Sequence, residues 1–180
     1  AVDQFFAHDG YNAVLEFDGP NDSDLTHRYL WGPAVDQILA DEQVTSLSSP
    51  GNILWGLTDH LGTPRDIADL NEGSGVTSVT NHRTYSSFGV RTAETNAAVD
   101  LLFGYIGKAY DEVTGVQYNL HRPYIAWLGQ FPTEDPIVFW AGDANLRRVV
   151  GNQVTYRTDP TGLIDPARAA WDYFWYDTLY

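Results

Sequence analysis

Residues 52–70, Asn-Ile-Leu-Trp-Gly-Leu-Thr-Asp-His-Leu-Gly-Thr-Pro-Arg-Asp-Ile-Ala-Asp-Leu, contain two short apolar segments on either side of a turn. Asn52–Thr58 and Arg65–Leu70 each have the length and composition of a β-strand. Between them, residues 59–64 supply Asp, Gly and Pro, which favour tight turns. The stretch therefore predicts two neighbouring antiparallel strands.

The same alternation of strand-like and turn-like segments extends in both directions. Further strands are predicted at 13–17, 25–31 and 76–87, and a hairpin is predicted from 101–110 and 115–118. Residues 35–40 and 96–102 break the pattern and are interpreted as single helical turns. Strands of this length, with turn signals every 8–15 residues, predict a mainly β, antiparallel fold.

The C-terminal segment differs in kind from the rest. Asp165-Pro166 has the sequence of a helix start, and apolar residues follow at helical spacing, so a short helix is predicted from Pro166 to about Thr178. Its aromatic residues occupy more than one helical face, so we expect some of them to be exposed or buried against a partner. The alternative is that the tail packs wholly on its own sheet. We expect a β domain over 1–163, followed by an aromatic tail over 164–180.

Charge excludes several classes of function. The 180 residues include 10 Lys and Arg but 24 Asp and Glu, which gives a net charge of −14. A nucleic-acid binder that neutralises phosphates needs a basic surface, and anionic membranes repel such a chain. No apolar run approaches the 18 residues of a membrane-spanning helix. We therefore expect neither nucleic-acid binding nor membrane insertion.

The absence of Cys and Met is also informative. Without Cys there is no disulfide framework, thiol nucleophile or thiolate metal site. A chain that begins at Ala1 and lacks Met is expected to be a processed product of a longer precursor. Because Cys and Met are the residues most easily oxidised, their absence favours a secreted protein, outside the cell or on its surface.

Several motifs in this order resemble one known family. Residues 58–65 (Thr-Asp-His-Leu-Gly-Thr-Pro-Arg), the segment from Phe103 to Asn119 and the terminal Asp159-Pro-Thr-Gly-Leu163 are similar to motifs of the Rhs repeat-associated core domain. The segment from Asp9 to Gly32 looks like the YD repeats that precede that core. The resemblance covers about 9–163. It implies that the antiparallel sheet is part of a spiral that builds a hollow shell, which the core domain closes as a plug.

The resemblance also implies a catalytic pair. Asp135 and Asp159 match the aspartates with which toxin-bearing members of the family cut their own chain after the terminal motif, here after Leu163. Two carboxylates in one site can divide the acid and base roles that hydrolysis needs. The alternative is that each Asp only caps a turn before its Pro. The family's Arg is Gln130 here, and a Gly is replaced by Val138. These departures favour the alternative, so we expect the Leu163–Ile164 bond to be mostly intact.

An acidic loop is the one candidate metal site. Asp18, Asn21, Asp22 and Asp24 place four oxygen-bearing side chains within seven residues, and hard oxygen ligands suit Ca²⁺. The spacing is not that of an EF-hand, and a solvated hairpin loop would have the same composition. No other cofactor is implied, because the chain has no phosphate-binding loop and its five His lack metal-binding spacing.

Three functions remain in competition. In the first, a secreted structural protein associates with itself, head to tail or into a filament, through open sheet edges and aromatic ends. Residues 1–8 would be an exchanged strand, and the interface residues would be Phe5, Phe6, Trp171, Phe174 and Trp175. The second is the shell plug with its autoprotease site. The third is a carbohydrate-binding module that takes surface glycans on its exposed aromatic residues.

Overall fold

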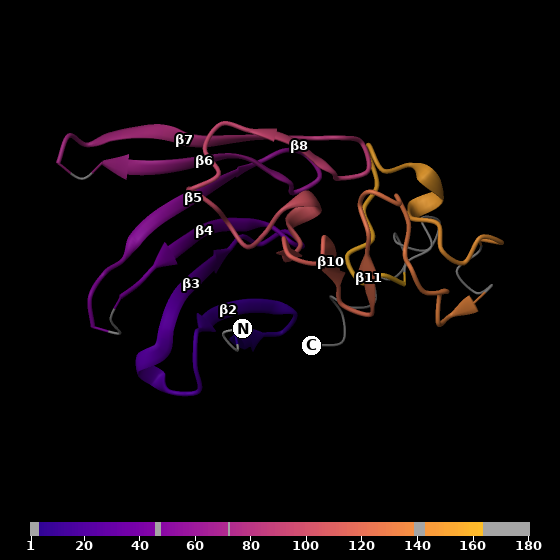
Figure 1. Cartoon of the computed structure of the whole chain (residues 1–180), viewed down its shortest axis with the longest axis horizontal. Coiled ribbons are helices and arrows are strands. Elements are labelled where there is room, and N and C mark those ends of the chain that lie inside the picture. The colour runs from indigo at the N-terminus through magenta and orange to yellow at the C-terminus, as the bar shows by residue number, and fades with distance from the viewer. Residues whose placement is uncertain (1–3, 46–47, 72, 139–142, 164–180) are drawn as a thin grey trace. The chain divides into compact units, whose positions relative to one another are not determined.

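A computed structural model describes residues 4–45, 48–71, 73–138 and 143–163 (Figure 1). The predicted antiparallel β architecture is confirmed: eight strands form one sheet and three form another. The strands are β1 (Phe5–Asp9), β2 (Asn12–Phe17), β3 (Leu25–Trp31), β4 (Ile38–Gln43), β5 (Asn52–Thr58), β6 (Pro64–Asn71), β7 (Val76–Tyr85), β8 (Arg91–Glu94), β9 (Tyr110–Asp111), β10 (Val116–Asn119) and β11 (Arg122–Tyr124). Short 3₁₀ turns are η1 (Asp22–Asp24), η2 (Tyr105–Gly107) and η4 (Val150–Asn152).

The chain divides into two compact units. The first comprises residues 1–84 and 91–107, and the second comprises 85–90 and 108–180. In the first unit the strand order is β1 to β8 without a crossover, so each strand pairs with its neighbour in sequence, as Figure 1 shows. The second unit carries β9, β10 and β11.

No described helix is long and apolar enough to span a membrane.

The core of the first unit lies on one face of its sheet. Leu54 of β5 and Ile67 of β6 are buried against Leu101, with Val99 beside them. Farther along this face, the ring of Phe103 contacts Tyr29 and Trp31 edge-on, at centroid distances of 5.0 and 4.8 Å. The segment after β8 therefore covers the inner face of the sheet and supplies much of the apolar burial that stabilises the unit.

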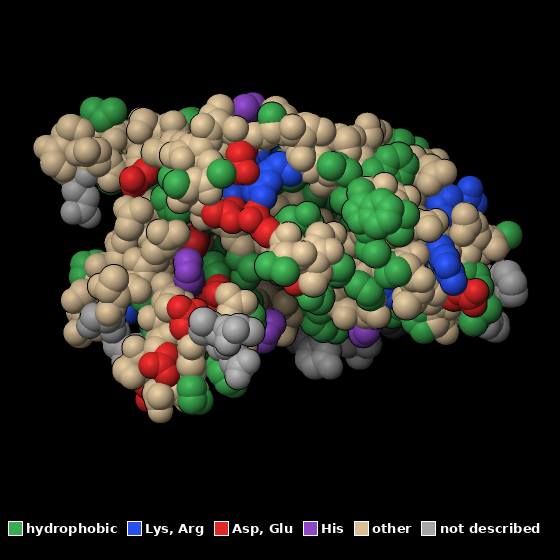
Figure 2. Space-filling model, in the orientation of Figure 1, with side chains coloured by type: hydrophobic (Ala, Val, Ile, Leu, Met, Phe, Trp, Pro, Cys, Tyr) green, Lys and Arg blue, Asp and Glu red, His purple; other side chains and the backbone are tan. Residues whose placement is uncertain are grey.

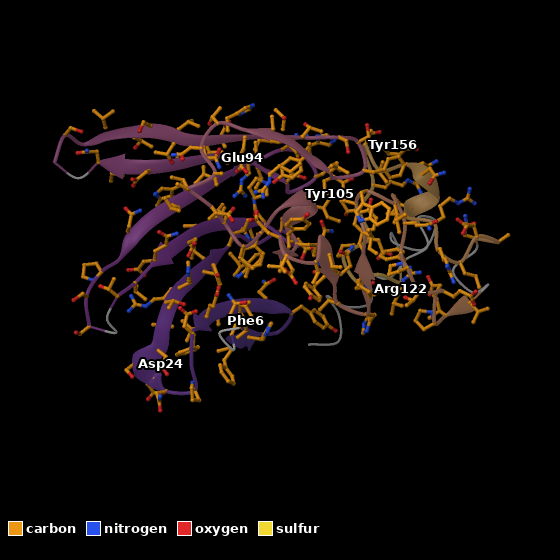
Figure 3. All side chains as sticks on the ribbon, viewed as in Figure 1. Phe6, Asp24, Glu94, Tyr105, Arg122 and Tyr156 are labelled. Atoms are coloured by element: carbon orange, nitrogen blue, oxygen red, sulfur yellow. The ribbon has the colours of Figure 1, made fainter. Side chains whose placement is uncertain are left out.

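Ion pairs occupy one border of this unit. The buried guanidinium of Arg83 contacts Asp100 and lies 3.8 Å from Glu94, while Arg91 lies 3.5 Å from Glu94. Figure 2 shows acidic and basic side chains side by side on this face, where Figure 3 labels Glu94. Arg83 lies on β7, Glu94 on β8 and Asp100 in the loop that follows, so these ion pairs join the two strands to that loop.

Some sequence predictions need correction. Residues 35–40 are not a helical turn: Ala34 and Gln37 close a turn, and Ile38 begins β4. Residues 96–102 hold a turn closed by the Val99 N–H on the Asn96 carbonyl, and no helix. In the predicted hairpin from 101, only Tyr110–Asp111 is a strand paired with β10. The predicted helix from Pro166 lies outside the described residues.

Candidate functional site

Asp135 and Asp159, which are 24 residues apart in sequence, meet at one arginine. The same terminal nitrogen of Arg122 lies 2.8 Å from Oδ2 of Asp135 and 3.6 Å from Oδ2 of Asp159. The two carboxylate oxygens are therefore no farther apart than the sum of those distances. Arg122 and both aspartates are buried. Figure 3 labels Arg122, the first residue of β11.

Three further contacts fix the guanidinium of Arg122 in this position. Its carbon lies 3.8 Å from the centre of the Phe131 ring, whose side chain is fully buried. Its remaining terminal nitrogen donates to the Leu146 carbonyl at 3.1 Å, and its Nε donates to the Gly162 carbonyl. A planar, multiply hydrogen-bonded cation of this kind has little freedom to leave the two carboxylates.

Asp159 also organises the turn that ends the described chain. Its Oδ1 accepts hydrogen bonds from the backbone N–H of Gly162 at 2.8 Å and of Leu163 at 3.1 Å. The turn therefore wraps around the carboxylate and returns Leu163 to it. Asp135 caps its own turn in a similar way, because its Oδ1 accepts the N–H of Ile137 at 3.0 Å. Both aspartates thus cap turns, as the structural alternative predicts, and they also share a cation.

The β10–β11 hairpin holds this terminal turn. Asn119 donates from its side chain to the Asp159 carbonyl, and the backbone N–H of His121 donates to the Thr161 carbonyl at 3.1 Å. Gly162 has a φ of +77°, and a Cβ on it would lie 2.6 Å from the Asn119 carbonyl oxygen. A glycine is therefore required where the turn crosses the hairpin.

Burial and charge oppose one another at Arg122. Removal from water lowers the pKa of its guanidinium, while the charges of Asp135 and Asp159 raise it, and the net shift is downward. With both carboxylates ionised, the trio carries one unbalanced negative charge in a buried place.

The sequence did not indicate Arg122 as part of the site. The substitution of Gln130 for the family's Arg suggested that the aspartates lack a cation, but Gln130 uses its backbone to bridge Ile125 and Arg148. One signal was present: Arg122 is the only arginine between Arg91 and Arg147. Arg147, Arg148 and Arg157 lie nearer to Asp159 in sequence, however, so this signal alone would not have selected Arg122.

The acidic loop forms a turn. Asp24 accepts hydrogen bonds from the backbone and side-chain nitrogens of Asn21, both at 2.9 Å, and these lower the pKa of its carboxyl group. Within the described residues, no three His, Asp or Glu side chains are arranged to hold a metal ion. Calcium binding by Asp18, Asn21, Asp22 and Asp24 stays a prediction, which a calcium-dependent melting temperature would test.

The predicted interface residues are only partly described. Phe5 and Phe6 lie in β1, an edge strand of the large sheet, and pair with Phe17 and Glu16 of β2 in the same chain. Trp171, Phe174 and Trp175 lie outside the described residues.

Comparison with known proteins gives bacterial relatives, among them a toxin. The chain is 31% identical over 109 residues to the toxin protein Tse5 of Pseudomonas aeruginosa, an alignment that covers 61% of this chain and 8% of Tse5. It is 42% identical over 59 residues to the uncharacterized protein YibJ of Escherichia coli, covering 33% of this chain and 24% of YibJ. The chain thus spans only a small part of the curated relatives that it matches.

Solved structures share the fold. The complex TcdB2-TccC3 has a TM-score of 0.62 at 19% identity, covering 88% of this chain and 8% of the solved one. A form described as lacking its hypervariable C-terminal region has a TM-score of 0.61 at 19% identity and covers 83% of this chain. Residues 33–158 match the family described as teneurin YD-shell, which confirms the resemblance to Rhs and YD-repeat proteins. The chain therefore belongs to the teneurin YD-shell family.

Proposed function

We propose that this chain is the closing segment of a longer YD-type shell and that its aspartate pair cuts the chain after Leu163. This proposal replaces the expectation of an intact bond, which rested on the loss of the family's Arg at Gln130, because Arg122 supplies a cation to both aspartates. One observation carries the proposal: Arg122 holds Asp135 and Asp159 at one point, and Asp159 binds the backbone N–H of Leu163 at 3.1 Å. The chain matches only 8% of the length of Tse5 and 8% of the solved TcdB2-TccC3 chain, which supports the proposal that it is a piece of a larger shell.

The reaction is hydrolysis of a peptide bond by water. One aspartate takes a proton from the water as its oxygen attacks the carbonyl carbon of Leu163. The bond from that carbon to the nitrogen of Ile164 then breaks, and the other aspartate gives a proton to the leaving nitrogen. The products are a new carboxylate on Leu163 and a new amino group on Ile164.

Arg122 serves this reaction by position and by charge. It contacts both carboxylates and the Gly162 carbonyl, so it fixes the catalytic pair relative to the backbone next to the cut. Its positive charge also balances one of the two buried carboxylates. Charged groups that are held in place before the reaction begins lower its barrier, because they need no rearrangement during the reaction.

Intact-mass measurement on the purified chain tests the proposal. We expect a species that ends at Leu163 to accumulate on incubation, and we expect Asp135→Asn and Asp159→Asn to prevent it. Asp143→Asn is the matched control, because Asp143 pairs with Arg148 in the same unit but outside the site. Thermal unfolding identifies variants that fail to fold. A wild-type chain that stays at full length between pH 4 and pH 8 would overturn the proposal.

Association between copies is a second candidate function, for a chain located outside the cell. β1 and β8 end the eight-stranded sheet, so each has only one strand neighbour in it. Phe5 and Phe6 on β1 are 45% and 38% exposed, and a strand from another copy could pair with this edge. Light scattering tests this candidate: deletion of residues 1–9 should convert large assemblies to monomers, and a wild-type monomer at high concentration contradicts it.

A further inference from the structure

The outer face of the large sheet, opposite the core, carries a straight row of apolar residues. Successive side chains on a strand point to opposite faces, and directly paired residues share a face. The strand pairing therefore joins five residues across β3 to β7: Leu30 to Ala40, Ala40 to Trp55, Trp55 to Ala68, and Ala68 to Val79. We call these five residues the outer row.

The outer row alternates large and small residues. Leu30, Trp55 and Val79 are 51%, 39% and 54% exposed, whereas Ala40 and Ala68 between them are 4% and 3% exposed. Three ridges therefore stand above two grooves. Because strands lie about 4.8 Å apart, neighbouring ridges are separated by about 10 Å. In stacked sheets the side chains of the two facing surfaces interdigitate, and alternating large and small residues allow this.

Apolar residues and paired charges border the row. Ile53, Leu57 and Leu70 are exposed on the same face of β5 and β6. The polar residues nearby are paired with one another: Arg28 and Glu42 lie 3.1 Å apart, and a ring nitrogen of His82 lies 2.6 Å from a carboxylate oxygen of Asp66. The apolar row itself carries no charged side chain, and an interface centre is likewise depleted of charge.

We propose that the outer row binds the outer row of a second copy of this chain, about a twofold axis that runs parallel to the strands between β5 and β6. This axis places Trp55 of each copy over Ala68 of the other, and Val79 over Ala40. It also brings Ile53 to Leu70. Trp55 and Val79 of one sheet thus enter the two grooves of the other, at the separation of about 10 Å that is usual for stacked sheets.

The size and polarity of the contact suit a dimer. Each copy contributes the three ridges and three bordering apolar residues, so the two copies together bury on the order of 1,000 Å², the lower end for a specific interface. The axis also places Glu42 near the hydroxyl of Thr77 of the other copy, so the carboxylate keeps a polar neighbour. Trp55 lies near the centre, where aromatic residues contribute most.

This contact is independent of the proposed cleavage after Leu163. It also differs from the association through the β1 edge strand described above, here called edge pairing. It uses the face of β3 to β7, whereas edge pairing uses the backbone of β1. Because a twofold contact is closed, it yields dimers and not filaments. The two modes of association are therefore separable by the size of the assembly and by the variants that abolish it.

Sedimentation equilibrium of the full chain at high salt, where repulsion between the acidic copies is screened, tests the proposal. We expect a monomer–dimer equilibrium that Trp55→Glu weakens at least tenfold. Val113→Glu is the control, because Val113 is 95% exposed in a loop of the second unit. Deletion of residues 1–9 should leave the dimer intact.

An exchange of ridge and groove sharpens the test. Ala68→Trp fills the groove and should abolish the dimer, whereas Trp55→Ala combined with Ala68→Trp restores a ridge opposite a groove and should recover it. Circular dichroism confirms folding of each variant. A monomeric wild type at high salt, a dimer unaffected by Trp55→Glu, or a dimer lost on deletion of residues 1–9 would each overturn the proposal.

Discussion

Asn119 donates a hydrogen bond of 3.0 Å from its side chain to the main-chain carbonyl of Asp159, forty residues farther along the chain. Both residues are buried, and Gln117 donates to the Asn119 side-chain oxygen at 2.9 Å. A two-residue relay on β10 thus determines where the terminal turn lies. The position of the candidate catalytic carboxylate consequently depends on a hairpin far from it in sequence.

Asn119→Ala should loosen the terminal turn. The change leaves the Asp159 carbonyl and the Gln117 amide buried without these partners, which costs about 1–3 kcal/mol for an unsatisfied group. We expect a lower free energy of unfolding in urea and faster hydrogen exchange at the amides of Gly162 and Leu163. Asn52→Ala, at an exposed position, should change neither. Unchanged exchange at both amides would show that the relay does not hold the turn.

Arg122→Gln should destabilise the second unit strongly. Loss of the cation leaves two buried carboxylates facing one another, and breaking a buried ion pair on one side costs about 3–5 kcal/mol. Chemical denaturation measures the loss. Adding Asp135→Asn to the variant should recover part of it, because the remaining repulsion disappears. Arg147→Gln, on a half-exposed side chain, should cost far less. Equal losses from both arginines would contradict the role assigned to Arg122.

Gly162→Ala should displace the turn without removing any charge. The positive φ and the 2.6 Å approach of a Cβ to the Asn119 carbonyl both oppose a side chain at this position. We expect the species ending at Leu163 to be absent from the mass spectrum while Asp135 and Asp159 remain. Gly151→Ala provides the control, since it also has a positive φ but has open space around it. Cleavage at the wild-type rate in Gly162→Ala would show that the turn tolerates the displacement.

His27 should make the first unit less stable as the pH rises. Burial lowers the pKa of its imidazole, but the hydrogen bond of 2.8 Å to Asp41 and the nearby carboxylates outweigh this, and the net shift is upward. A raised pKa in the folded state means that the stabilisation is complete below the ordinary value of about 6.5 and is lost as the pH rises through the folded value. Melting temperatures from pH 5 to pH 9 measure this decline. His27→Gln should flatten the profile, and a profile unchanged by the substitution would exclude His27 as its source.

Salt should stabilise the whole chain. With a net charge of −14 and few cations, like charges repel one another in the compact state, and added salt screens that repulsion. We expect the melting temperature to rise steadily with KCl. A zwitterionic osmolyte at matched osmolality serves as the control. It adds no ionic strength, so it shows any stabilisation that comes from exclusion of the solute from the protein surface and not from screening of charge. A melting temperature that falls with KCl would mean that the buried ion pairs outweigh surface repulsion.

The strand pattern of the large sheet followed directly from the sequence where turn signals were strong. Gly and Asp residues around 18–24 and the turn at 59–64 gave β2, β3, β5 and β6 nearly at their observed bounds. β4 was missed because Asp41 and Glu42 interrupt its apolar pattern. Asp41 is buried by its hydrogen bond to His27 on β3, a compensation that only the tertiary structure reveals.

The candidate site could be predicted only in part for a similar reason. Asp135 and Asp159 belong to short motifs that the sequence displays. Arg122 reaches them because β11 pairs with β10 and the terminal turn folds back across that hairpin. Proximity of this kind is set by packing between residues far apart in sequence. The family motif, with Gln130 in place of its arginine, predicted instead that the aspartates have no cation beside them.

The uninterrupted order of β1 to β8 has a mechanical consequence. Since no strand of this sheet is held between two strands remote in sequence, a pull on the N-terminal end would peel β1 from β2, then β2 from β3, and so on. Such a sheet should yield through many small force steps in an optical trap. The same local pairing lets each hairpin form as soon as its two strands emerge from the ribosome, with little chain entropy lost at each step.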